Sequence, residues 1–379
     1  MSALTVAAFL PLTAWLYLLL DRGTFWRARE RDDAEQIPEL AHWPAVTAIV
    51  PARNEADVIA QSIGSLLAQN YPGTLRIVLV DDQSDDGTGR IARVLTESDN
   101  LDVIQGEARP HGWTGKLWAM SQGASHAASH APDYFWFTDA DIDHGPDNLR
   151  HLVAHAEHDN LVLTSLMAKL SCINPAERFF IPAFVYFFQM LYPFAWVNDP
   201  KNRTAAAAGG CMLVNRAALE RAGGLGAIRN ALIDDCALGK LMKAHGPVWL
   251  GLTERALSIR PYENMNAIRR MVARSAYAQL NYSPLLLAGT LGGLLIVFVA
   301  PVLFALLGTG VARLAGIAAL LIMVASFVPM LRFYGRAPLW GFALPAIGLL
   351  YAVFTLDSAV QHWRGRGGMW KGRAQAMTR

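Results

Sequence analysis

Apolar residues are concentrated toward the two ends of the chain, and a region of mixed polar and apolar pattern lies between them. Toward the ends, residues 3–20, 283–312, 314–331 and 337–356 contain no charged residue. Each is long enough, or nearly so, to cross a bilayer as a helix. The pattern therefore predicts an N-terminal membrane anchor over residues 1–21 and about three transmembrane helices over residues 284–360.

Charged residues beside these runs give an expectation for the topology. The first run has no basic residue before it and no small-residue cleavage site after it, so we interpret it as an anchor and not as a signal peptide. The net basic segment that follows favours a multi-pass protein of the inner membrane whose residues 22–283 face the cytoplasm. Three later spans would leave the tail, residues 361–379, outside, although its basic residues favour the inside. Either one of the three later apolar runs is re-entrant, or the preference of basic residues for the inside is overridden.

The central region alternates between strand-like and helix-like patterns. Residues 46–50 form a β-rich run that ends at Pro51, and residues 55–69 have apolar positions at helical spacing. A buried strand over residues 75–80 and a helix from residue 91 follow. This order predicts one α/β domain with a mostly parallel sheet, in which ligands bind at the carboxyl ends of the strands.

Polar clusters follow three of the predicted strands. They are PARNE after the first strand, DDQSDDGT after the second, and TDAD after an aromatic strand over residues 134–137. Asp139, Asp141 and Asp143 stand at alternate positions of this last segment. Carboxylates so close together repel one another unless a cation lies among them, so the stretch predicts a metal site. For Asp143 a helix-capping role is the alternative.

Other interpretations of the acidic stretch fit less well. An EF-hand loop would use the same three aspartates, but here the glycine falls one place late and the closing glutamate is missing. A DxDxT nucleophile motif needs threonine where Asp143 stands. The chain also has no GxGxxG and no GxxxxGK[ST] motif, so neither a dinucleotide fold nor a P-loop is supported.

Composition narrows the class of protein further. Hydrophobic residues make up 53% of the chain and charged residues 17%, which is typical of a partly membrane-embedded protein. A net charge of +2 is too small to suggest nucleic acid as a partner. Cys172, Cys211 and Cys236 have no metal-ligand spacing and form no even disulfide set, which favours a reducing location for the central domain.

The clusters PARNE, VDDQSDDGT and TDADI, in this order and spacing, resemble the family 2 glycosyltransferases with the GT-A fold. The resemblance covers residues 46–277. The segment HGWTGKLWAMSQG and the membrane pattern are most similar to hopene-associated glycosyltransferases, and more distantly to ceramide glucosyltransferases. The resemblance implies a hexosyltransferase-type enzyme whose GT-A domain binds a nucleotide-sugar donor, most simply a UDP-sugar.

The resemblance also assigns residues to the nucleoside part of the donor site. Pro51, Ala52 and Arg53 would line the base pocket. Glu55 would lie near the nucleoside, and Asp82 would accept a hydrogen bond from the uracil ring.

The diphosphate of the donor is negatively charged, so we expect cations beside it in the site. Asp141 would hold a divalent metal ion, and Asp139 would bind the metal or the ribose. Oxygen ligands suit Mg²⁺ or Mn²⁺, and such an ion would neutralise the charge that grows on the leaving diphosphate. Lys116 stands where a cation would meet the diphosphate, with a solvated surface lysine as the alternative.

The acceptor side is expected in the later part of the domain. The resemblance makes Asp235, the second acid of LIDDCALGK, the general base of an inverting transfer, with Asp234 beside it. Helix capping is the alternative for both aspartates, because Asp is favoured at helix starts. Gly209 and Gly210 would let the backbone approach the sugar.

One departure from the family pattern concerns the acceptor. Processive synthases and ceramide glucosyltransferases carry (Q/R)xxRW after the base, and this chain has RRMVARSAYAQL. Arg274 takes the place of the arginine, but Met271 and Ser275 replace its neighbours. This difference disfavours polymer synthesis.

Residues 179–197 are nearly all apolar and rich in aromatic side chains. If they crossed the membrane alone, Asp235 would lie across it from Asp141, so we interpret them as an interfacial or re-entrant segment that delivers a lipid acceptor. We expect a membrane-bound, inverting, metal-dependent glycosyltransferase, with a hopanoid as a candidate acceptor. A processive polysaccharide synthase and an inactive sugar-nucleotide-binding scaffold remain as alternatives.

Overall fold

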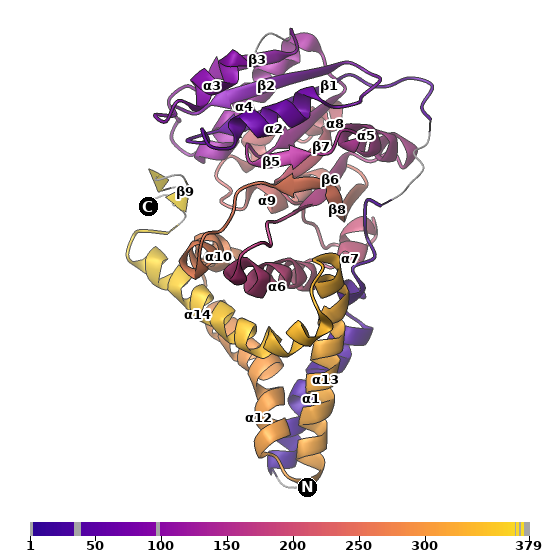
Figure 1. Cartoon of the computed structure of the whole chain (residues 1–379), viewed down its shortest axis with the longest axis vertical. Helices are drawn as coiled ribbons and strands as arrows, with labels where there is room; N and C mark the ends of the chain where they lie inside the picture. The colour runs from indigo at the N-terminus through magenta and orange to yellow at the C-terminus, as the bar shows by residue number, and fades with distance from the viewer. Residues whose placement is uncertain (1–2, 34–38, 96–98, 368, 371–372, 375–379) are drawn as a thin grey trace.

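An eight-stranded sheet of order β3-β2-β1-β4-β7-β6-β8-β5 forms the centre of the upper half of the molecule (Figure 1). The computed structural model describes residues 3–33, 39–95, 99–367, 369–370 and 373–374. The strands are β1 (Val46–Ala52), β2 (Leu75–Asp81), β3 (Leu101–Gln105), β4 (Tyr134–Thr138), β5 (Ile142–His144), β6 (Leu163–Lys169), β7 (Cys211–Asn215) and β8 (Val248–Ser258). Strands β3, β2, β1 and β4 are mutually parallel, and β7 is antiparallel to both of its neighbours. The predicted mostly parallel α/β sheet is confirmed.

Helices cover both faces of this sheet. They are α2 (Ile59–Leu67), α3 (Thr88–Val94), α4 (Gly115–Ala127), α5 (Asn148–His158), α8 (Arg216–Arg221) and α9 (Asp234–Lys243), with short 3₁₀ turns η2 (Ala128–His130) and η3 (Leu225–Ile228). Successive residues of a strand point to opposite faces. In β1, Ala48 and Val50 accordingly join one apolar cluster and Ile49 joins the other. Burial on both faces explains why this strand reads as a continuous apolar run.

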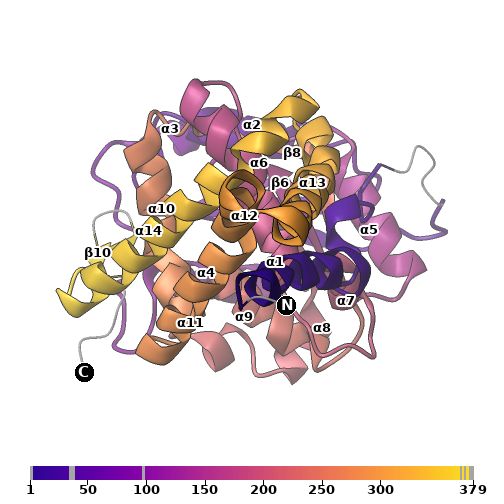
Figure 2. The ribbon, with the colours of Figure 1, turned by 90° about the horizontal axis from the view of Figure 1, so that it is seen from below.

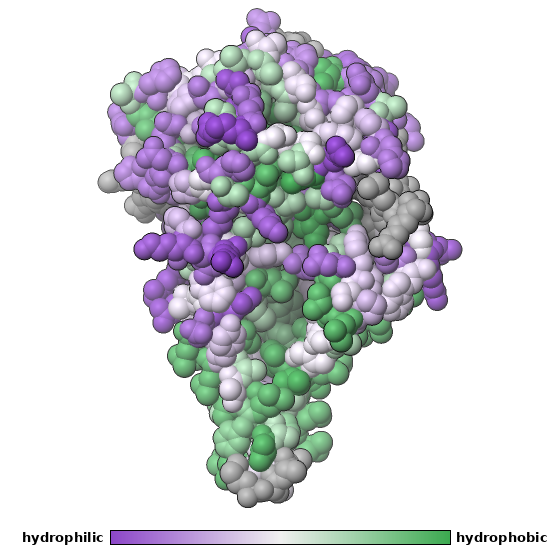
Figure 3. Space-filling view, turned by 180° about the vertical axis from the view of Figure 1, so that it is seen from behind, coloured by the Kyte–Doolittle hydropathy of each residue, from purple (hydrophilic) through white to green (hydrophobic). Residues whose placement is uncertain are grey.

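Apolar helices form a tapering lower half (Figures 1 and 3). They are α1 (Ala3–Leu20), α11 (Pro284–Leu294), the π-helical turn η4 (Leu295–Val299), α12 (Ala300–Leu307), α13 (Gly310–Phe333), the 3₁₀ turn η5 (Pro338–Ala343) and α14 (Leu344–Trp363). Among the described residues, three continuous helical segments are long and apolar enough to cross a membrane: Pro284–Leu307, Gly310–Phe333 and Pro338–Trp363. Thr5–Leu20 is a shorter apolar helix.

Two helices lie across the boundary between the halves (Figure 1). They are α6 (Pro175–Leu191) and α10 (Met265–Gln279); the 3₁₀ turn η1 (Phe25–Arg27) and α7 (Phe194–Asn198) lie nearby. A capping box between Asn174 and Glu177 starts α6. The hydroxyls of Tyr186 in α6 and Ser326 in α13 lie 2.7 Å apart. The apolar segment 179–197 therefore runs over the ends of the lower helices and not through them; its depth in a bilayer stays a prediction.

The last long helix bears on the expected conflict in topology. Figure 2 groups α1, α12 and α13 together, whereas α14 extends obliquely away from them. Helix α14 packs on α10, where Arg269 Nη1 lies 2.6 Å from Asp357 Oδ2. The strands β9 (Met369–Trp370) and β10 (Arg373–Ala374) then lie close to the α/β domain (Figure 1). This arrangement favours the re-entrant alternative, with residues 361–367 on the same side as the sheet.

We predict that single cysteines at positions 158 and 364 are labelled from one side of the membrane and a cysteine at position 309 from the other. His158 and Arg364 are exposed on the side of the sheet, and Thr309 joins α12 to α13 at the far end. The measurement is labelling by a membrane-impermeant maleimide in oriented vesicles, with Cys172 and Cys236 replaced by alanine. Labelling of position 364 together with position 309 would contradict the arrangement.

Candidate active site

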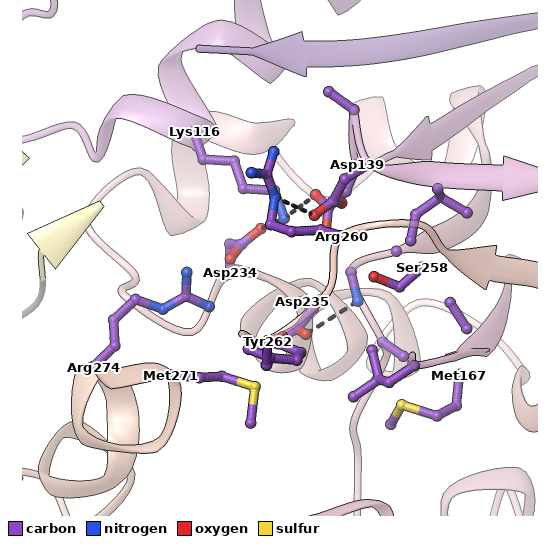
Figure 4. A pocket seen from close by; sticks show the side chains of 18 of the residues that line it. Lys116, Asp139, Met167, Asp234, Asp235, Ser258, Arg260, Tyr262, Met271 and Arg274 are labelled. Carbon is purple, nitrogen blue, oxygen red and sulfur yellow. Dashed lines mark hydrogen bonds and ion pairs between the residues drawn. The ribbon is translucent and has the colours of Figure 1, made fainter. Parts of the chain in front are cut away.

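A cavity of about 540 Å³ lies where the polar turns of the sheet meet α6, α9 and α10 (Figure 4). Parallel strands β1 and β4 are in register, so the turns that follow them end at the same edge. Pro51 and Glu55 follow β1, and Asp139 and Asp141 follow β4; all four line the cavity. The structure thus brings the predicted donor side together.

Lys116 joins the donor side to the acceptor side. Its Nζ lies 2.7 Å from Asp139 Oδ1 and 3.1 Å from Asp234 Oδ2, and its side chain is 17% exposed. Burial alone lowers the pKa of Lys116, but the two carboxylates outweigh burial and hold this pKa above its ordinary value. The alternative of a solvated surface lysine is therefore wrong.

Asp235 is fixed by backbone groups at the start of α9. Its Oδ2 accepts a hydrogen bond from the Gly209 N–H at 3.1 Å, and its Oδ1 accepts one from the Cys236 N–H at 2.7 Å. Burial and then the charge of Asp234 raise the pKa of Asp235 to about 6, although Lys116 opposes the shift. This carboxylate is therefore poised to exchange a proton near neutral pH.

The predicted glycines sit where side chains would crowd the site. A Cβ at Gly209 would lie 3.1 Å from Lys116 Nζ and 3.4 Å from Asp235 Oδ2. At Gly210 it would lie 3.2 Å from the Cβ of Ala168. Both glycines line the cavity. Their backbone is thus open to a bound molecule.

None of these acids is the N-cap of a helix, although Asp234 and Asp235 both stand in the first turn of α9, where acidic side chains are favoured. Helix α9 has Ile233 at its N-cap and no side-chain capping bond, and Asp234 is paired with Lys116 instead. Asp143 lies within β5, where its Oδ2 accepts a hydrogen bond from Gln61 Nε2 at 2.8 Å.

The remaining predicted donor residues lie beside the cavity and not in its lining. Asp82 is 1% exposed, and its N–H donates to the Ala52 carbonyl at 2.8 Å. Arg53 donates through Nη1 to the Asp82 and Gln83 carbonyls. These contacts hold the turns after β1 and β2 together, so the proposed base pocket would extend beyond the cavity.

Arg260 is a site residue that the sequence analysis missed. Its guanidinium contacts Glu55, and its Nε lies 3.1 Å from Asp141 Oδ2. Arg260 follows β8, which pairs with β5 so that Ser258 lies opposite Ile142. The sequence did contain a signal for Arg260. An arginine that closely follows a buried strand is a candidate residue for the edge of the sheet where the carboxyl ends of the strands meet.

The far side of the cavity is apolar and basic. Phe184 and Phe188 of α6 line it together with Met271 of α10. Arg270 and Arg274 of α10 also line the cavity, and within the described ranges neither forms an ion pair with a carboxylate. The cavity therefore leads from an acidic edge to an apolar wall that carries two arginines.

Comparison with known proteins agrees with this fold. Residues 47–223 match the family model for glycosyl transferase family 2. The resemblance to this family that the three motifs predicted is confirmed over these residues, and the chain has the GT-A fold.

Similar proteins fall into two kinds. A 100-residue stretch is 35% identical to 4,4'-diaponeurosporenoate glycosyltransferase of Staphylococcus aureus (strain USA300), and the match is 34% for strain bovine RF122. These matches cover 26% of the chain and only 24% of the relatives. The structure of a mannosyltransferase from Pyrobaculum calidifontis in complex with GDP-Man and Mn²⁺ covers 96% of this chain and 98% of its own, with a TM-score of 0.54 and 20% identity. That similarity concerns the fold.

We predict that Lys116→Met lowers the free energy of unfolding by about 2 kcal/mol at pH 8, because it leaves the partly buried carboxylates of Asp139 and Asp234 without a counter-charge. The loss should shrink toward pH 5. Without Lys116 the pKa of Asp235 rises further, so the folded protein binds its proton more tightly than the unfolded chain does, and stability falls as pH rises. Denaturant unfolding at both pH values measures this. Lys169→Met, which removes the partner of exposed Glu254, is the control and should show no such pH dependence.

Proposed function

We propose that the protein is a membrane-bound, inverting glycosyltransferase that moves a hexose from a nucleotide-sugar, with a UDP-sugar as first candidate, to a lipid acceptor. The observation that carries the proposal is one cavity that is lined both by the acids Asp139, Asp141 and Asp235 and by Phe184 and Phe188 of α6. Such a cavity suits an amphiphile whose reactive group must meet a charged donor.

The donor would bind across the turns after β1, β2 and β4. Glu55 and Asp82 would contact the nucleoside beside Pro51, Ala52 and Arg53, as the family resemblance implies. Lys116 already places one positive charge within 2.7 Å of Asp139, on the side where a diphosphate would lie. The donor site is thereby partly organised before any donor binds.

The acidic edge fits a divalent ion that the donor helps to hold. Asp141 and Asp139 offer carboxylate oxygens of the kind that Mg²⁺ and Mn²⁺ prefer. Across the part of the chain that the structure describes, no group of three acidic, His or Cys side chains is arranged to hold an ion alone. Donor oxygens would therefore have to complete the ligand set. When bound, the ion would neutralise charge on the leaving diphosphate.

Asp235 is the proposed general base. Its carboxylate would take the proton from the acceptor hydroxyl while that oxygen bonds to the sugar's anomeric carbon and the sugar–phosphate bond breaks. A pKa of about 6 leaves Asp235 ionised at pH 7 and above, and keeps it basic enough to accept the proton. The Gly209 N–H fixes the direction of the carboxylate.

A lipid acceptor is supported by the wall between the cavity and the lower helices. Phe187, between Phe184 and Phe188 on α6, packs on Phe298 of η4 and Tyr351 of α14. The apolar wall is thus continuous with the candidate membrane spans. The lipid-modifying Staphylococcus aureus relatives point the same way, and a hopanoid remains our candidate acceptor.

The proposed orientation follows from charge and geometry. Basic residues after α1 favour the cytoplasmic face of the inner membrane for the α/β domain. Asp234, Arg274 and the backbone of Gly209 and Gly210 line the same cavity and would contact the acceptor there.

We predict that Asp235→Asn lowers kcat by about 10²–10⁴-fold and leaves the affinity for UDP close to that of the wild type. In the wild type, kcat should fall as the pH drops through about 6, because protonated Asp235 cannot accept a proton. Asp234→Asn is the matched comparison. It removes a charge that raises the pKa of Asp235, so the fall of kcat on the acidic side of the pH profile should move to lower pH in this variant. Full turnover by Asp235→Asn would place the base elsewhere.

Transfer itself is tested with the purified full chain in nanodiscs, radiolabelled UDP-hexoses and a bacterial lipid extract. We predict one singly glycosylated lipid, loss of transfer in excess chelator, and recovery with Mn²⁺ or Mg²⁺. Undiminished transfer in chelator would contradict the metal proposal. A ladder of longer products would instead indicate a processive synthase.

A further inference from the structure

Arg260 makes contacts that the proposed reaction does not yet use. Its guanidinium joins Glu55, which follows β1, to Asp141, which follows β4. Glu55 is 8% exposed, so its carboxylate faces inward to this contact. Figure 4 shows Arg260 reaching across the pocket toward Lys116 and Asp139. One side chain therefore neutralises two acids from separate turns.

The backbone fixes Arg260 at this place. Ser258 lies opposite Ile142 in the antiparallel pairing of β8 with β5, and the Ile259 N–H donates to the Asp141 carbonyl at 2.9 Å. Arg260 and Asp141 thus stand on two segments that are tied together one residue away. The Arg260 side chain is 35% exposed, which leaves it access to the cavity.

A guanidinium and a divalent ion would compete for the same carboxylate. Asp141 pairs with Arg260 in the free protein, and Asp141 is also the proposed metal ligand. A guanidinium is always charged and binds phosphate oxygens in a bidentate manner. If a metal ion displaced Arg260 from Asp141, the guanidinium would still lie beside the expected position of the donor's diphosphate.

We propose that Arg260 is a resident cation of the donor site: it neutralises Glu55 and Asp141 in the free protein and turns to the donor's diphosphate when a divalent ion takes Asp141. This inference rests on the proposed function of the same cavity. It has two consequences of opposite sign. Arg260 weakens the binding of a metal ion alone, and it strengthens the binding of a nucleoside diphosphate.

The test measures both affinities on the full chain in detergent. Binding of Mn²⁺ alone is followed by the electron paramagnetic resonance signal of the free ion, and binding of UDP and GDP in saturating Mn²⁺ by calorimetry. For Arg260→Gln we expect Mn²⁺ alone to bind about tenfold more tightly and the preferred nucleoside diphosphate about tenfold more weakly. A purely structural role would not move the two constants in opposite directions.

Two further variants allow the inference to be tested even if Arg260→Gln folds poorly. Arg260→Lys retains the charge but not the bidentate geometry, so Mn²⁺ affinity should stay near wild type while diphosphate affinity falls in part. Arg255→Gln, in the strand β8 that precedes Arg260, is the matched control. Arg255 pairs with Asp32 outside the cavity lining, so neither affinity should change.

The outcomes separate this inference from the proposed function. If Arg260→Gln leaves both affinities unchanged, or lowers both, the resident-cation role is overturned. If the wild type binds neither UDP nor GDP with Mn²⁺ present, the proposed function fails. In that case the Mn²⁺ measurement alone still decides whether Arg260 competes for Asp141.

Discussion

The ion pairs of Lys116 hold the functional centre of this protein together. The lysine lies between Asp139, which follows the aromatic strand β4, and Asp234, which opens α9. These acids belong to segments far apart in sequence, and one belongs to each side of the proposed reaction. Lys116 therefore couples the donor side to the acceptor side and also opposes the rise in the pKa of Asp235.

Charge balance explains why so many acids are tolerated at one edge. Parallel strands bring their carboxyl ends together, and here each end carries carboxylates that would repel one another. Lys116 and Arg260 each bridge two of these acids. A donor diphosphate and a metal ion together would change that balance, so binding should rearrange these pairs and not merely fill a space.

The membrane side of the cavity follows from the placement of two helices. Helices α6 and α10 lie across the boundary between the sheet and the apolar helices (Figure 1). Their apolar residues face the cavity on one side, and on the other Phe187 and Arg269 contact the lower helices. A reactive group anchored in a lipid would thus meet Asp235 without leaving the apolar wall.

Local patterns in the sequence predicted much of this arrangement. The three polar clusters could be assigned to one edge of the sheet because parallel strands place the turns that follow them at the same edge. Asp139, Asp141, Asp235 and Lys116 line the cavity there, as expected. Arg260 was missed because it reaches Asp141 only through the pairing of β5 with β8, which are distant in sequence. The role of Asp234 was obscured because an acid at a helix start also suits a cap. The oblique course of α14 could not be predicted from the sequence, because a hydropathy pattern indicates the length of an apolar helix and not its direction in space.

The central claim is that the acidic edge and the lipid acceptor share one cavity. Photo-crosslinking the full chain in nanodiscs with a lipid that carries a diazirine near its hydroxyl group tests it most directly, with the labelled peptides identified by mass spectrometry. We expect label on Phe184, Phe188 or Met271, and loss of that label when Phe184 and Phe188 are replaced by tryptophan to fill the cavity. Label confined to the outward-facing Leu306, Leu307 and Val311 would show that the acceptor binds elsewhere.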